Sequence, residues 1–523
     1  MQIRLATRGS RLALAQSGLI ADALRNLGAE VELVRVRTLG DVSTAPLSSL
    51  GGVGVFVAAV REAVLAGDCD LAVHSLKDLP TRPAEGLTIA AIPEREDARD
   101  ALCARNNFTL DALPAGSWVG TGSPRRAAQL ALTRPDLRVA DIRGNVDTRL
   151  ARVGKDLDAV VLAAAGLHRL GLAGAITQYL GTLDMMPAPA QGALAIECRS
   201  DDLPMIELLA RLDDPGTRAA VELERAAMRA VEAGCAAPFG ALARANLGDL
   251  SIHAVLATGA GARRSIVVGP IASADELALR VAAEVAPLRG LRVLIPPSGL
   301  ADVLEAERTT VNTQAFTVTE PLAVRPFVQA LTEAPDVIAF TSARTVRVLT
   351  EGGVDLATEI PLGTTIAAVG DATAAALREA GLRVGLKPTN GSGGAALAGV
   401  FADGPGTVLI PGAADPAPDL AEALAARGWN VVPVPVYRTM PVTSVDATIA
   451  DAWPDYDVFV VTAPSVARAA SELLDMPGPP VVALGATSAA AAAALGFDVV
   501  GTATEATAAG LVDALVALRK EQS

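Results

Sequence analysis

The sequence predicts an α/β protein of several lobes, arranged as two unlike halves. Three observations lead to this fold class. Short apolar runs alternate with helical patterns through the first half, similar motifs recur in the same order in the second half, and 523 residues exceed what one hydrophobic core organises. The first half is expected to form two hinged α/β lobes and a small α+β domain, and the second half two further α/β lobes.

The first half opens with a strand, a helix and a second strand. Ile3–Ala6 is a short apolar run, Arg11–Leu27 has helical periodicity that Gly28 ends, and Glu30–Arg37 is the next strand. Four further strands are expected, each followed by a loop and a helix start: Asp70–His74, Ser117–Gly120, Leu137–Ile142 and Asp158–Ala163.

Two proline-containing segments, Ile92–Asp97 and Met186–Pro189, indicate where the chain crosses between lobes. A chain that leaves a lobe near the first and returns near the second gives one lobe from 1–93 with 188–213 and another from 94–187. Because both crossings act as hinges, we expect a ligand in the cleft between these lobes.

A smaller unit is expected at 214–287, with a helix at Ala219–Ala233 and a strand at Leu250–Leu256. The second half, from about residue 289, contains an internal repeat. The matched segments are 292–296 with 407–411, 336–342 with 457–462, and 367–370 with 482–485. Three landmarks in one order predict two similar α/β lobes.

Composition limits the classes of function. The net charge of −14 argues against a general nucleic-acid or anionic-membrane surface, and the 3% aromatic content argues against stacking on bases. Four cysteines without CxxC spacing fit a reducing compartment and predict no metal site. With neither a signal peptide nor an apolar segment long enough to span a bilayer, we expect a soluble cytoplasmic protein without nucleic-acid or membrane partners.

The placement of arginines is the most informative feature of the first half. They fall at carboxyl ends of predicted strands or at helix starts, where open α/β sheets bind ligands. Guanidinium groups match carboxylates in two-point geometry, so the set predicts a substrate with many carboxylates. The alternative is that this chain, with only four lysines, uses arginine for solubility. The residues are Arg8, Arg125, Arg126, Arg143, Arg149 and Arg169, with Ser10 after the first strand and Ser123 suited to cap a helix.

Two further sites carry reactive groups. Lys77 and Asp78 follow a strand, where a carboxylate beside a cation is suited to move a proton or stabilise a cationic intermediate. The alternative is an ordinary ion pair at a turn, and His74 nearby is interpreted as a buried or capping residue. Cys235 lies in a loop whose small neighbours leave room for an attached group, although burial is the default for such a cysteine.

The first 285 residues closely resemble the hydroxymethylbilane synthase (porphobilinogen deaminase) family. The motifs that carry the resemblance are Ala6-Thr-Arg-Gly-Ser10, Val73-His-Ser-Leu-Lys-Asp-Leu-Pro80, Val119-Gly-Thr-Gly-Ser-Pro-Arg-Arg126, Ile142-Arg-Gly-Asn-Val-Asp-Thr-Arg149, Ala165-Gly-Leu-His-Arg-Leu-Gly171, Pro189-Ala-Gln-Gly-Ala193 and the Gly234-Cys235 loop. One departure is Val53, where the family usually has a lysine in a glycine-rich stretch.

The resemblance implies a dipyrromethane cofactor attached to Cys235 by a thioether and made from the substrate itself. It implies that Asp78 supports the cations that form as ammonia leaves porphobilinogen and as pyrroles couple, with Lys77 beside it. It further implies that acetate and propionate groups are held by the six arginines named above. The expected cofactor-binding residues are Lys77, Asp78, Ser123, Arg125 and Arg126, and the expected substrate-binding residues are Arg8, Ser10, Ser75, Arg143, Arg149 and Arg169.

The second half resembles uroporphyrinogen-III synthase, through Phe340-Thr-Ser-Ala343, Ala368-Val-Gly370, Val436-Tyr-Arg438, Val461-Thr-Ala-Pro-Ser465 and Ala483-Leu-Gly-Ala-Thr487. The resemblance implies two lobes joined by a two-stranded linker, one from 289–319 with 438–520 and the other from 320–437. Tyr437 is the candidate to assist the leaving hydroxyl, although a packing role is equally expected. The candidate substrate binders, each of which also suits a loop or helix cap, are Thr341, Ser342, Thr462 and Thr487.

The sequence therefore predicts a bifunctional monomer. It converts four porphobilinogen to hydroxymethylbilane with release of ammonia, and then cyclises this product, with inversion of the last ring, to uroporphyrinogen III. One alternative is that the second half only binds the product. Another is a hinged solute-binding protein, but this leaves Asp78 and Cys235 without roles.

Overall fold

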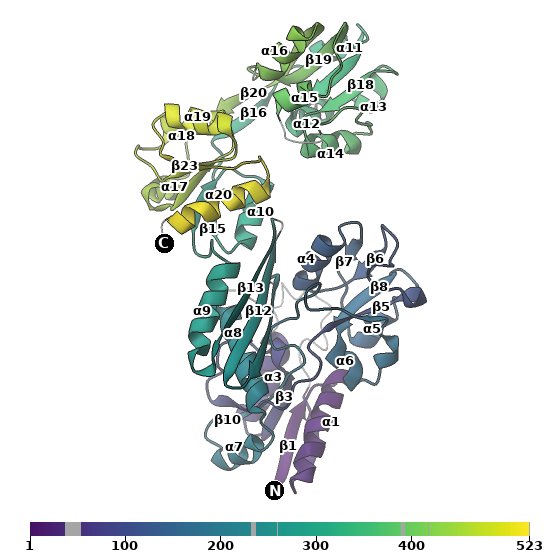
Figure 1. Cartoon of the computed structure of the whole chain (residues 1–523), viewed down its shortest axis with the longest axis vertical. Coiled ribbons are helices and arrows are strands. Elements are labelled where there is room, and N and C mark those ends of the chain that lie inside the picture. The colour runs from purple at the N-terminus through teal and green to yellow at the C-terminus, as the bar shows by residue number, and fades with distance from the viewer. Residues whose placement is uncertain (37–53, 232–236, 259, 389–392, 417, 522–523) are drawn as a thin grey trace. The chain divides into compact units, whose positions relative to one another are not determined.

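The computed structural model describes residues 1–36, 54–231, 237–258, 260–388, 393–416 and 418–521. It divides into two compact units, Met1–Gly290 with Glu305–Arg308, and Leu291–Leu304 with Thr309–Ser523. Both are built from α/β sheets in several lobes, as the sequence predicts (Figure 1).

The first sheet has the order β2-β1-β3-β10-β4, with β1 parallel to β2 and β3, and β10 antiparallel to β3 and β4. Its strands are β1 (Gln2–Thr7), β2 (Glu30–Arg35), β3 (Leu71–Ser75), β4 (Leu87–Ala91) and β10 (Leu194–Arg199), and its helices are α1 (Arg11–Asn26), α3 (Gly54–Leu65) and α7 (Leu203–Ala210). Ser10 caps α1 by accepting a hydrogen bond from Ala13 N, and Ile20 and Leu24 of α1 are buried against the sheet.

The second sheet has the order β7-β6-β8-β5-β9, with β6 parallel to β7 and β8, and β5 antiparallel to β8 and β9. Its strands are β5 (Asp100–Ala104), β6 (Trp118–Gly120), β7 (Arg138–Ala140), β8 (Ala159–Ala163) and β9 (Gln178–Tyr179), and its helices are α4 (Pro124–Thr133), α5 (Val146–Leu150) and α6 (Ala164–Arg169). Leu102, Val119 and Val161 form its core.

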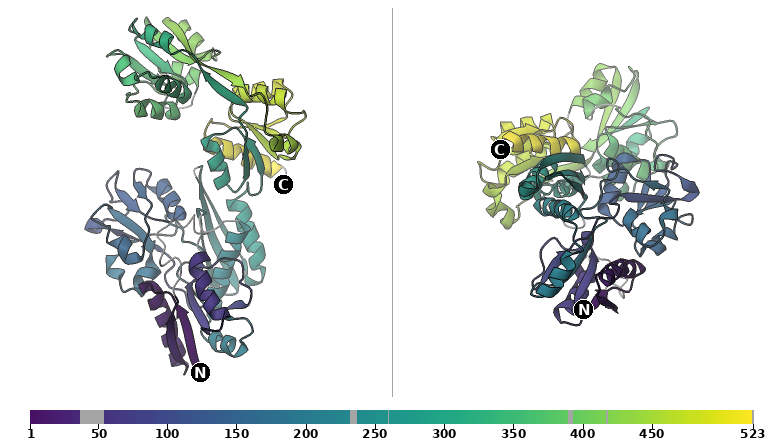
Figure 2. Two further views of the ribbon diagram at one scale, coloured as in Figure 1. Left: turned by 180° about the vertical axis from the view of Figure 1, so that it is seen from behind. Right: turned by 60° about the horizontal axis from the view of Figure 1, so that its bottom comes forward.

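A third, antiparallel sheet has the order β11-β12-β13. It contains β11 (Phe239–Asn246), β12 (Asp249–Thr258) and β13 (Gly261–Pro270), and two long helices, α8 (Pro215–Ala230) and α9 (Ala274–Val285), lie side by side against one face. The views from front and back show both helices along these strands (Figures 1 and 2). Asp214 caps α8 through Thr217 N, which explains why the helix begins before the predicted Ala219.

The segments that cross between the first two sheets lie close together. Gly192 has a positive φ of 92°, and a Cβ there would meet the Glu96 carbonyl oxygen at 2.3 Å, so only glycine fits this approach. The fully buried Glu224 of α8 joins both segments. It forms an ion pair with Arg95 at 2.6 Å and accepts hydrogen bonds from the backbone N–H groups of Ala190 and Ala243.

The second unit contains two five-stranded sheets. The first, β15-β14-β21-β22-β23, is wholly parallel, and the second, β16-β20-β19-β17-β18, is parallel except for β16. The strands are β14 (Arg292–Ile295), β15 (Thr310–Thr313), β16 (Thr317–Pro321), β17 (Val337–Phe340), β18 (Thr365–Ala368), β19 (Gly406–Ala413), β20 (Trp429–Pro441), β21 (Val458–Val461), β22 (Val481–Ala483) and β23 (Val499–Thr502). The helices are α10 (Gly299–Ala306), α11 (Arg325–Leu331), α12 (Ala343–Glu351), α13 (Leu356–Glu359), α14 (Asp371–Glu379), α15 (Gly394–Ala398), α16 (Asp419–Ala426), α17 (Ala447–Asp451), α18 (Pro464–Leu473), α19 (Ala486–Ala494) and α20 (Ala508–Glu521).

The repeated motifs form corresponding strands of these two sheets. In the first sheet β14, β21 and β22 are consecutive neighbours, and in the second β19, β17 and β18 are. Within each set, the two later motifs lead into a helix, α18 and α19 in one sheet and α12 and α14 in the other. The antiparallel pair of β16 and the end of β20, with Glu320 opposite Arg438, lies at the predicted limits of the lobes. The exact lobe boundaries stay a prediction.

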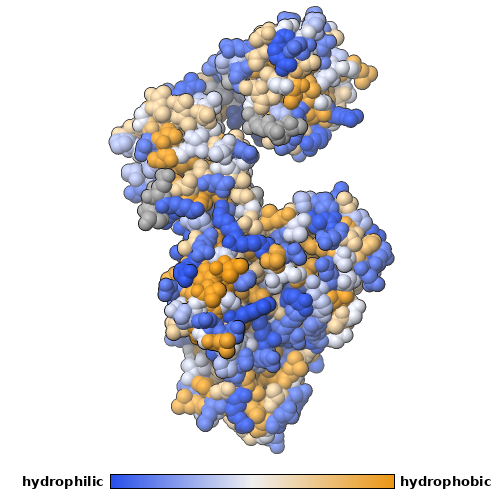
Figure 3. All heavy atoms as spheres, viewed as in Figure 1, coloured by the Kyte–Doolittle hydropathy of each residue, from blue (hydrophilic) through white to orange (hydrophobic). Residues whose placement is uncertain are grey.

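The surface is mixed. On the face shown in Figure 3, hydrophilic residues alternate with smaller apolar areas in both units. No helix in the described ranges is long and apolar enough to cross a membrane.

Candidate active site

The turn after β3 carries Lys77 and Asp78. It is a short 3₁₀ helix, η2 (Leu76–Asp78), whose Leu76 is fully buried. Asp78 is exposed, and among the described residues its carboxylate has no hydrogen-bond or ion-pair partner. Lys77 is only partly accessible and donates from Nζ to Gln191 Oε1 at 3.2 Å. The turn therefore presents one accessible carboxylate beside one partly enclosed ammonium group.

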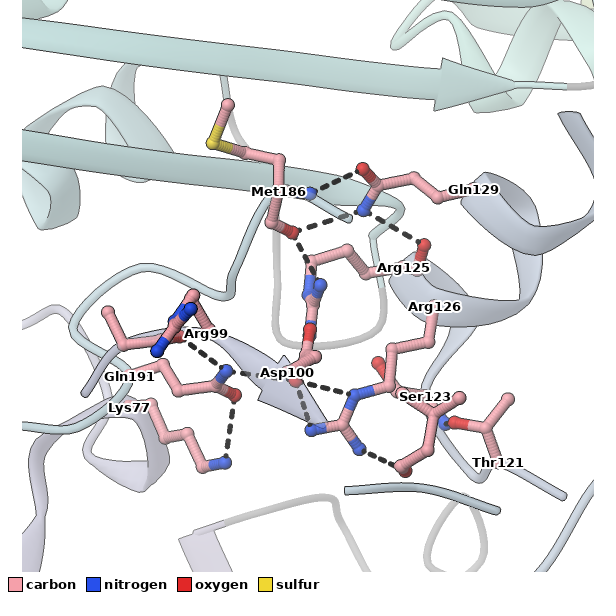
Figure 4. Close-up of polar contacts among 12 residues, drawn as sticks. Lys77, Arg99, Asp100, Thr121, Ser123, Arg125, Arg126, Gln129, Met186 and Gln191 are labelled. Atoms are coloured by element: carbon pink, nitrogen blue, oxygen red, sulfur yellow. Dashed lines mark hydrogen bonds and ion pairs between the residues drawn. The ribbon is translucent and has the colours of Figure 1, made fainter. Parts of the chain in front are cut away.

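Arg125 and Arg126, at the start of α4, meet a single buried carboxylate. Asp100 of β5 lies between their guanidinium groups, as Figure 4 shows. The distances are 2.8 Å from Arg125 Nη2 to Asp100 Oδ2 and 2.7 Å from Arg126 Nη2 to Asp100 Oδ1. Burying three charges requires this pairing, because an unpaired ion away from water carries a large desolvation penalty.

Gln191 links this group to Lys77. Its Nε2 donates to Asp100 Oδ1 at 2.9 Å and to Ala98 O at 2.8 Å, while its Oε1 accepts from Lys77 (Figure 4). The turn after β3, the start of α4 and the segment around Gln191 are thus brought together, although they lie far apart in the sequence.

The electrostatics of this cluster favour binding of an anionic ligand. The pKa of Lys77 is lowered to about 8, mainly by burial; the charges of Arg126 and Arg125 act in the same direction, and those of Asp78 and Asp100 oppose them. Burial alone would raise the pKa of Asp100, but Arg125 and Arg126 overcome it and hold that pKa at about 2. Burial also lowers the pKa of Arg149, to which the charge of Arg126 adds. These interactions link five cations, Lys77, Arg125, Arg126, Arg143 and Arg149, with three carboxylates, Asp78, Asp100 and Asp141, so the surplus is positive.

A carboxylate-bearing cofactor fits these residues. The Nε of Arg125 is buried, and it has no hydrogen-bond acceptor among the residues that the structure describes. Ser123 occupies the N-cap position of α4, as the sequence predicts, but its side chain makes no capping hydrogen bond. An unused donor, a hydroxyl group and surplus positive charge are what a group with acetate and propionate arms requires.

The other predicted residues of the first half occupy varied environments. Arg149 Nε donates to Gly144 O at 2.9 Å, and Arg169 Nη2 donates to Gly192 O at 2.6 Å in the crossing segment. Arg143 is exposed, 3.8 Å from Asp141. Ser10 caps α1, Ser75 shares a hydrogen bond with Gln16 at 2.9 Å, and Arg8 is half-buried. Cys235 and Val53 lie outside the described residues.

Comparison with known proteins supplies the family. Residues 3–207 match the model described as porphobilinogen deaminase, dipyromethane cofactor binding domain, and residues 218–286 match porphobilinogen deaminase, C-terminal domain. Porphobilinogen deaminase of Cutibacterium acnes is 56% identical over 256 residues, 46% of this chain and 77% of the relative. Porphobilinogen deaminase 1 of Streptomyces coelicolor is 50% identical over 297 residues, 54% of this chain and 93% of the relative.

The chain belongs to the porphobilinogen deaminase family. Its second half adds a different enzyme domain, since residues 303–513 match the model described as uroporphyrinogen-III synthase HemD. A mutant uroporphyrinogen III synthase from Thermus thermophilus of known structure is 22% identical and covers 45% of this chain and 100% of its own, with a TM-score of 0.33. That structural similarity is too low to bear on the fold. The fusion predicted from the sequence is confirmed by the order of the family matches.

In the second half of the sequence, the predicted substrate-binding residues follow parallel strands. Thr341 and Ser342 come directly after β17, and Thr462 directly after β21, all partly accessible. Thr487 is exposed in the first turn of α19. Ser342 caps α12 by accepting from Arg344 N at 3.1 Å, so this hydroxyl already has the capping role that the sequence left open.

Tyr437 has a different environment. Its side chain is 7% exposed and belongs to the core around Phe340 and Val436, with the Arg344 guanidinium 5.9 Å from its ring centre. This burial favours the packing role over direct contact with a leaving hydroxyl. The catalytic role of Tyr437 stays a prediction.

Sequence reasoning missed Asp100 and gave Gln191 no role. One signal was present, because two consecutive arginines at the start of a buried helix require a buried counter-charge. The acidic residues between Glu94 and Asp100 were available as candidates, but no local pattern distinguishes the member that faces the arginines.

Proposed function

We propose that this chain is a bifunctional enzyme of tetrapyrrole synthesis. Its first half joins four porphobilinogen units into hydroxymethylbilane with release of ammonia, and its second half cyclises that product to uroporphyrinogen III. The observation that carries this conclusion is the order of the two enzyme families along one chain, 3–286 and then 303–513, together with 50–56% identity to curated porphobilinogen deaminases.

In the first half, a dipyrromethane cofactor on Cys235 supplies the pyrrole carbon to which substrate units are added. Arg125, Arg126 and Lys77 orient its carboxylates, and the unused Arg125 Nε and the Ser123 hydroxyl supply further hydrogen bonds. The positive surplus around Asp100 supports this assignment, because it remains after the buried pairing is complete.

Asp78 is the catalytic carboxylate of this proposal. When the C–N bond of porphobilinogen breaks, ammonia departs and positive charge develops on the pyrrole and its methylene carbon. A new C–C bond then forms with the acceptor pyrrole, which afterwards loses a proton. An accessible carboxylate without a fixed partner is suited to stabilise that charge and to accept the proton.

The remaining predicted residues hold the lengthening chain. Each charged hydrogen bond contributes about 1.5–3 kcal/mol, so a full set acting on one ligand would prevent product release. We therefore expect the contacts to be shared among successive pyrrole units rather than used at once. The residues are Arg8, Ser10, Ser75, Arg143, Arg149 and Arg169.

In the second half, backbone N–H groups and hydroxyls are proposed to position the carboxylates. Helices α14, α18 and α19 begin without a side-chain cap at Gly370, Ala463 and Gly485, each directly beyond the carboxyl end of a parallel strand. Their first N–H groups favour anions. Thr341, Ser342, Thr462 and Thr487 are proposed as hydroxyl partners, and Tyr437 as the group that assists departure of water.

The product isomer tests this function. The full chain is incubated with porphobilinogen, the products are oxidised, and the type I and type III isomers are separated by chromatography. We expect type III to predominate, because spontaneous closure of hydroxymethylbilane leaves the last ring uninverted and gives type I. Exclusive type I product would mean that the second half does not catalyse ring inversion under these conditions. Monomeric state and cytoplasmic location stay predictions.

A further inference from the structure

Helix α8 makes two sets of contacts with the segments that carry the candidate active site. Glu224 holds both crossing segments, as described above. The next residue, Arg225, points to the turn after β3. Its Nη1 donates to Leu79 O at 3.0 Å and to Leu76 O at 3.2 Å, and its Nη2 donates to Pro80 O at 2.7 Å. Arg225 is only 8% exposed.

These three carbonyl groups belong to residues on either side of Lys77 and Asp78 in the sequence. Leu76 is the first residue of the 3₁₀ turn, and Leu79 and Pro80 follow its last residue, Asp78. The guanidinium group therefore holds the backbone on both sides of Lys77 and Asp78. The turn itself adds two backbone bonds, from Leu76 N to Ala193 O and from Leu79 N to Leu76 O.

Asp78 depends on its backbone for its position. Its carboxylate has no hydrogen bond or ion pair among the described residues, so the backbone of the turn determines where this side chain begins. Cys235 comes five residues after α8 ends at Ala230, so one helix leads to the proposed attachment point and also holds the proposed catalytic turn.

We propose that Arg225 is a positioning residue, which fixes the turn 76–80 against α8 and thereby sets the Asp78 carboxylate relative to the pyrrole chain. The inference rests on the proposed function of the first half. Lysine is a poor substitute, because a single ammonium group does not span three carbonyl groups as a planar guanidinium group does. Arg225 does not touch the substrate in this proposal. Lys77 in the same turn has its own hydrogen bond to Gln191, whereas Asp78 has no such partner among the described residues, so the effect of Arg225 on turnover is expected through Asp78.

The test is a double-mutant cycle on the full chain. Misplacement of a catalytic group by about 1 Å costs up to about 100-fold, so we expect Arg225→Lys to lower kcat by about 10- to 100-fold while KM for porphobilinogen stays within about two-fold. If Arg225 acts through Asp78, Asp78→Asn with Arg225→Lys has the turnover of Asp78→Asn alone. Because Asp78→Asn and the double variant are both expected to be slow, their turnover is compared by single-turnover mass spectrometry. If Arg225 had a merely structural role, the losses of turnover in Arg225→Lys and Asp78→Asn would instead multiply in the double variant.

The matched control is Arg229→Lys, one helical turn further along α8. Arg229 is exposed and, within the described residues, donates only to Thr81 O at 3.5 Å, so we expect turnover within about two-fold of the wild type. Wild-type turnover in Arg225→Lys, or multiplied losses in the double variant, would overturn the proposal. So would failure of both Arg225→Lys and Arg225→Gln to fold, which would make Arg225 a structural residue. A wild-type chain that releases no ammonia from porphobilinogen would instead overturn the proposed function itself.

Discussion

Replacement of Asp78 by asparagine is expected to lower turnover of porphobilinogen by about 100- to 10,000-fold, the range that a positioned acid–base or charge-stabilising group contributes. The substitution keeps the size of the side chain and removes its charge. Because Asp78 is exposed and unpaired among the described residues, folding has little to lose. The measurement is the initial rate of ammonia release, with circular dichroism to confirm the fold.

Asp141→Asn is the matched control. Asp141 is also an exposed carboxylate near Arg149, and its nearest cation is Arg143 at 3.8 Å. The same loss of charge in the same neighbourhood is expected to leave turnover within about two-fold, because a screened, exposed pair contributes little. Near-normal turnover in Asp78→Asn, or an equal loss in both variants, would reject the role of Asp78.

Replacement of Asp100 by alanine is expected to give the largest loss of stability. It leaves the guanidinium groups of Arg125 and Arg126 buried without their common partner, which costs about 3–5 kcal/mol in the free energy of unfolding. Differential scanning calorimetry of the full chain measures it. We expect the transition of the first unit to move to lower temperature, while that of the second unit provides an internal reference.

Asp22→Ala is the control for this variant, because its ion pair with Arg25 is exposed on α1. We expect no measurable shift of the transition. An Asp100→Ala protein as stable as the wild type would show that the buried pairing contributes no net stability.

The same carboxylate predicts a dependence on acid. The pKa of Asp100 is lowered from 3.8 to about 2 by folding, so it contributes stability that is fully present above pH 4 and is lost as the pH falls toward 2. A shift of this size corresponds to about 2 kcal/mol. The difference in stability between wild type and Asp100→Asn should therefore narrow over this range, and a constant difference would contradict the pairing.

Local sequence signals predicted those elements that local interactions determine. The first helix begins at Arg11 as expected, because Ser10 caps it, and Gly28 follows its end with a positive φ. The predicted strand Leu137–Ile142 is shorter, only Arg138–Ala140, because its partner β6 offers three residues for pairing. A strand at the edge of a sheet ends where its neighbour ends, and the strand's own sequence does not show where that is.

The candidate site was predicted in part for the same reason. Lys77, Asp78, Arg125 and Arg126 follow strand ends or begin a helix, so their approximate location follows from the order of elements. Their actual partners, Asp100 and Gln191, come from segments that tertiary folding brings to them. Arg225 had no sequence signal, because an arginine in the middle of a helix is common and its three carbonyl acceptors lie about 145 residues earlier.

The central claim is that a pyrrole chain grows on the Cys235 thiol among the cations around Asp100. Intact mass spectrometry of the natively purified full chain tests it most directly, with Cys235→Ser alongside. The account predicts a wild-type mass raised by one dipyrromethane, a further increase by pyrrole units when porphobilinogen is added, and neither change in Cys235→Ser. An unmodified wild-type chain that still consumes porphobilinogen would contradict it.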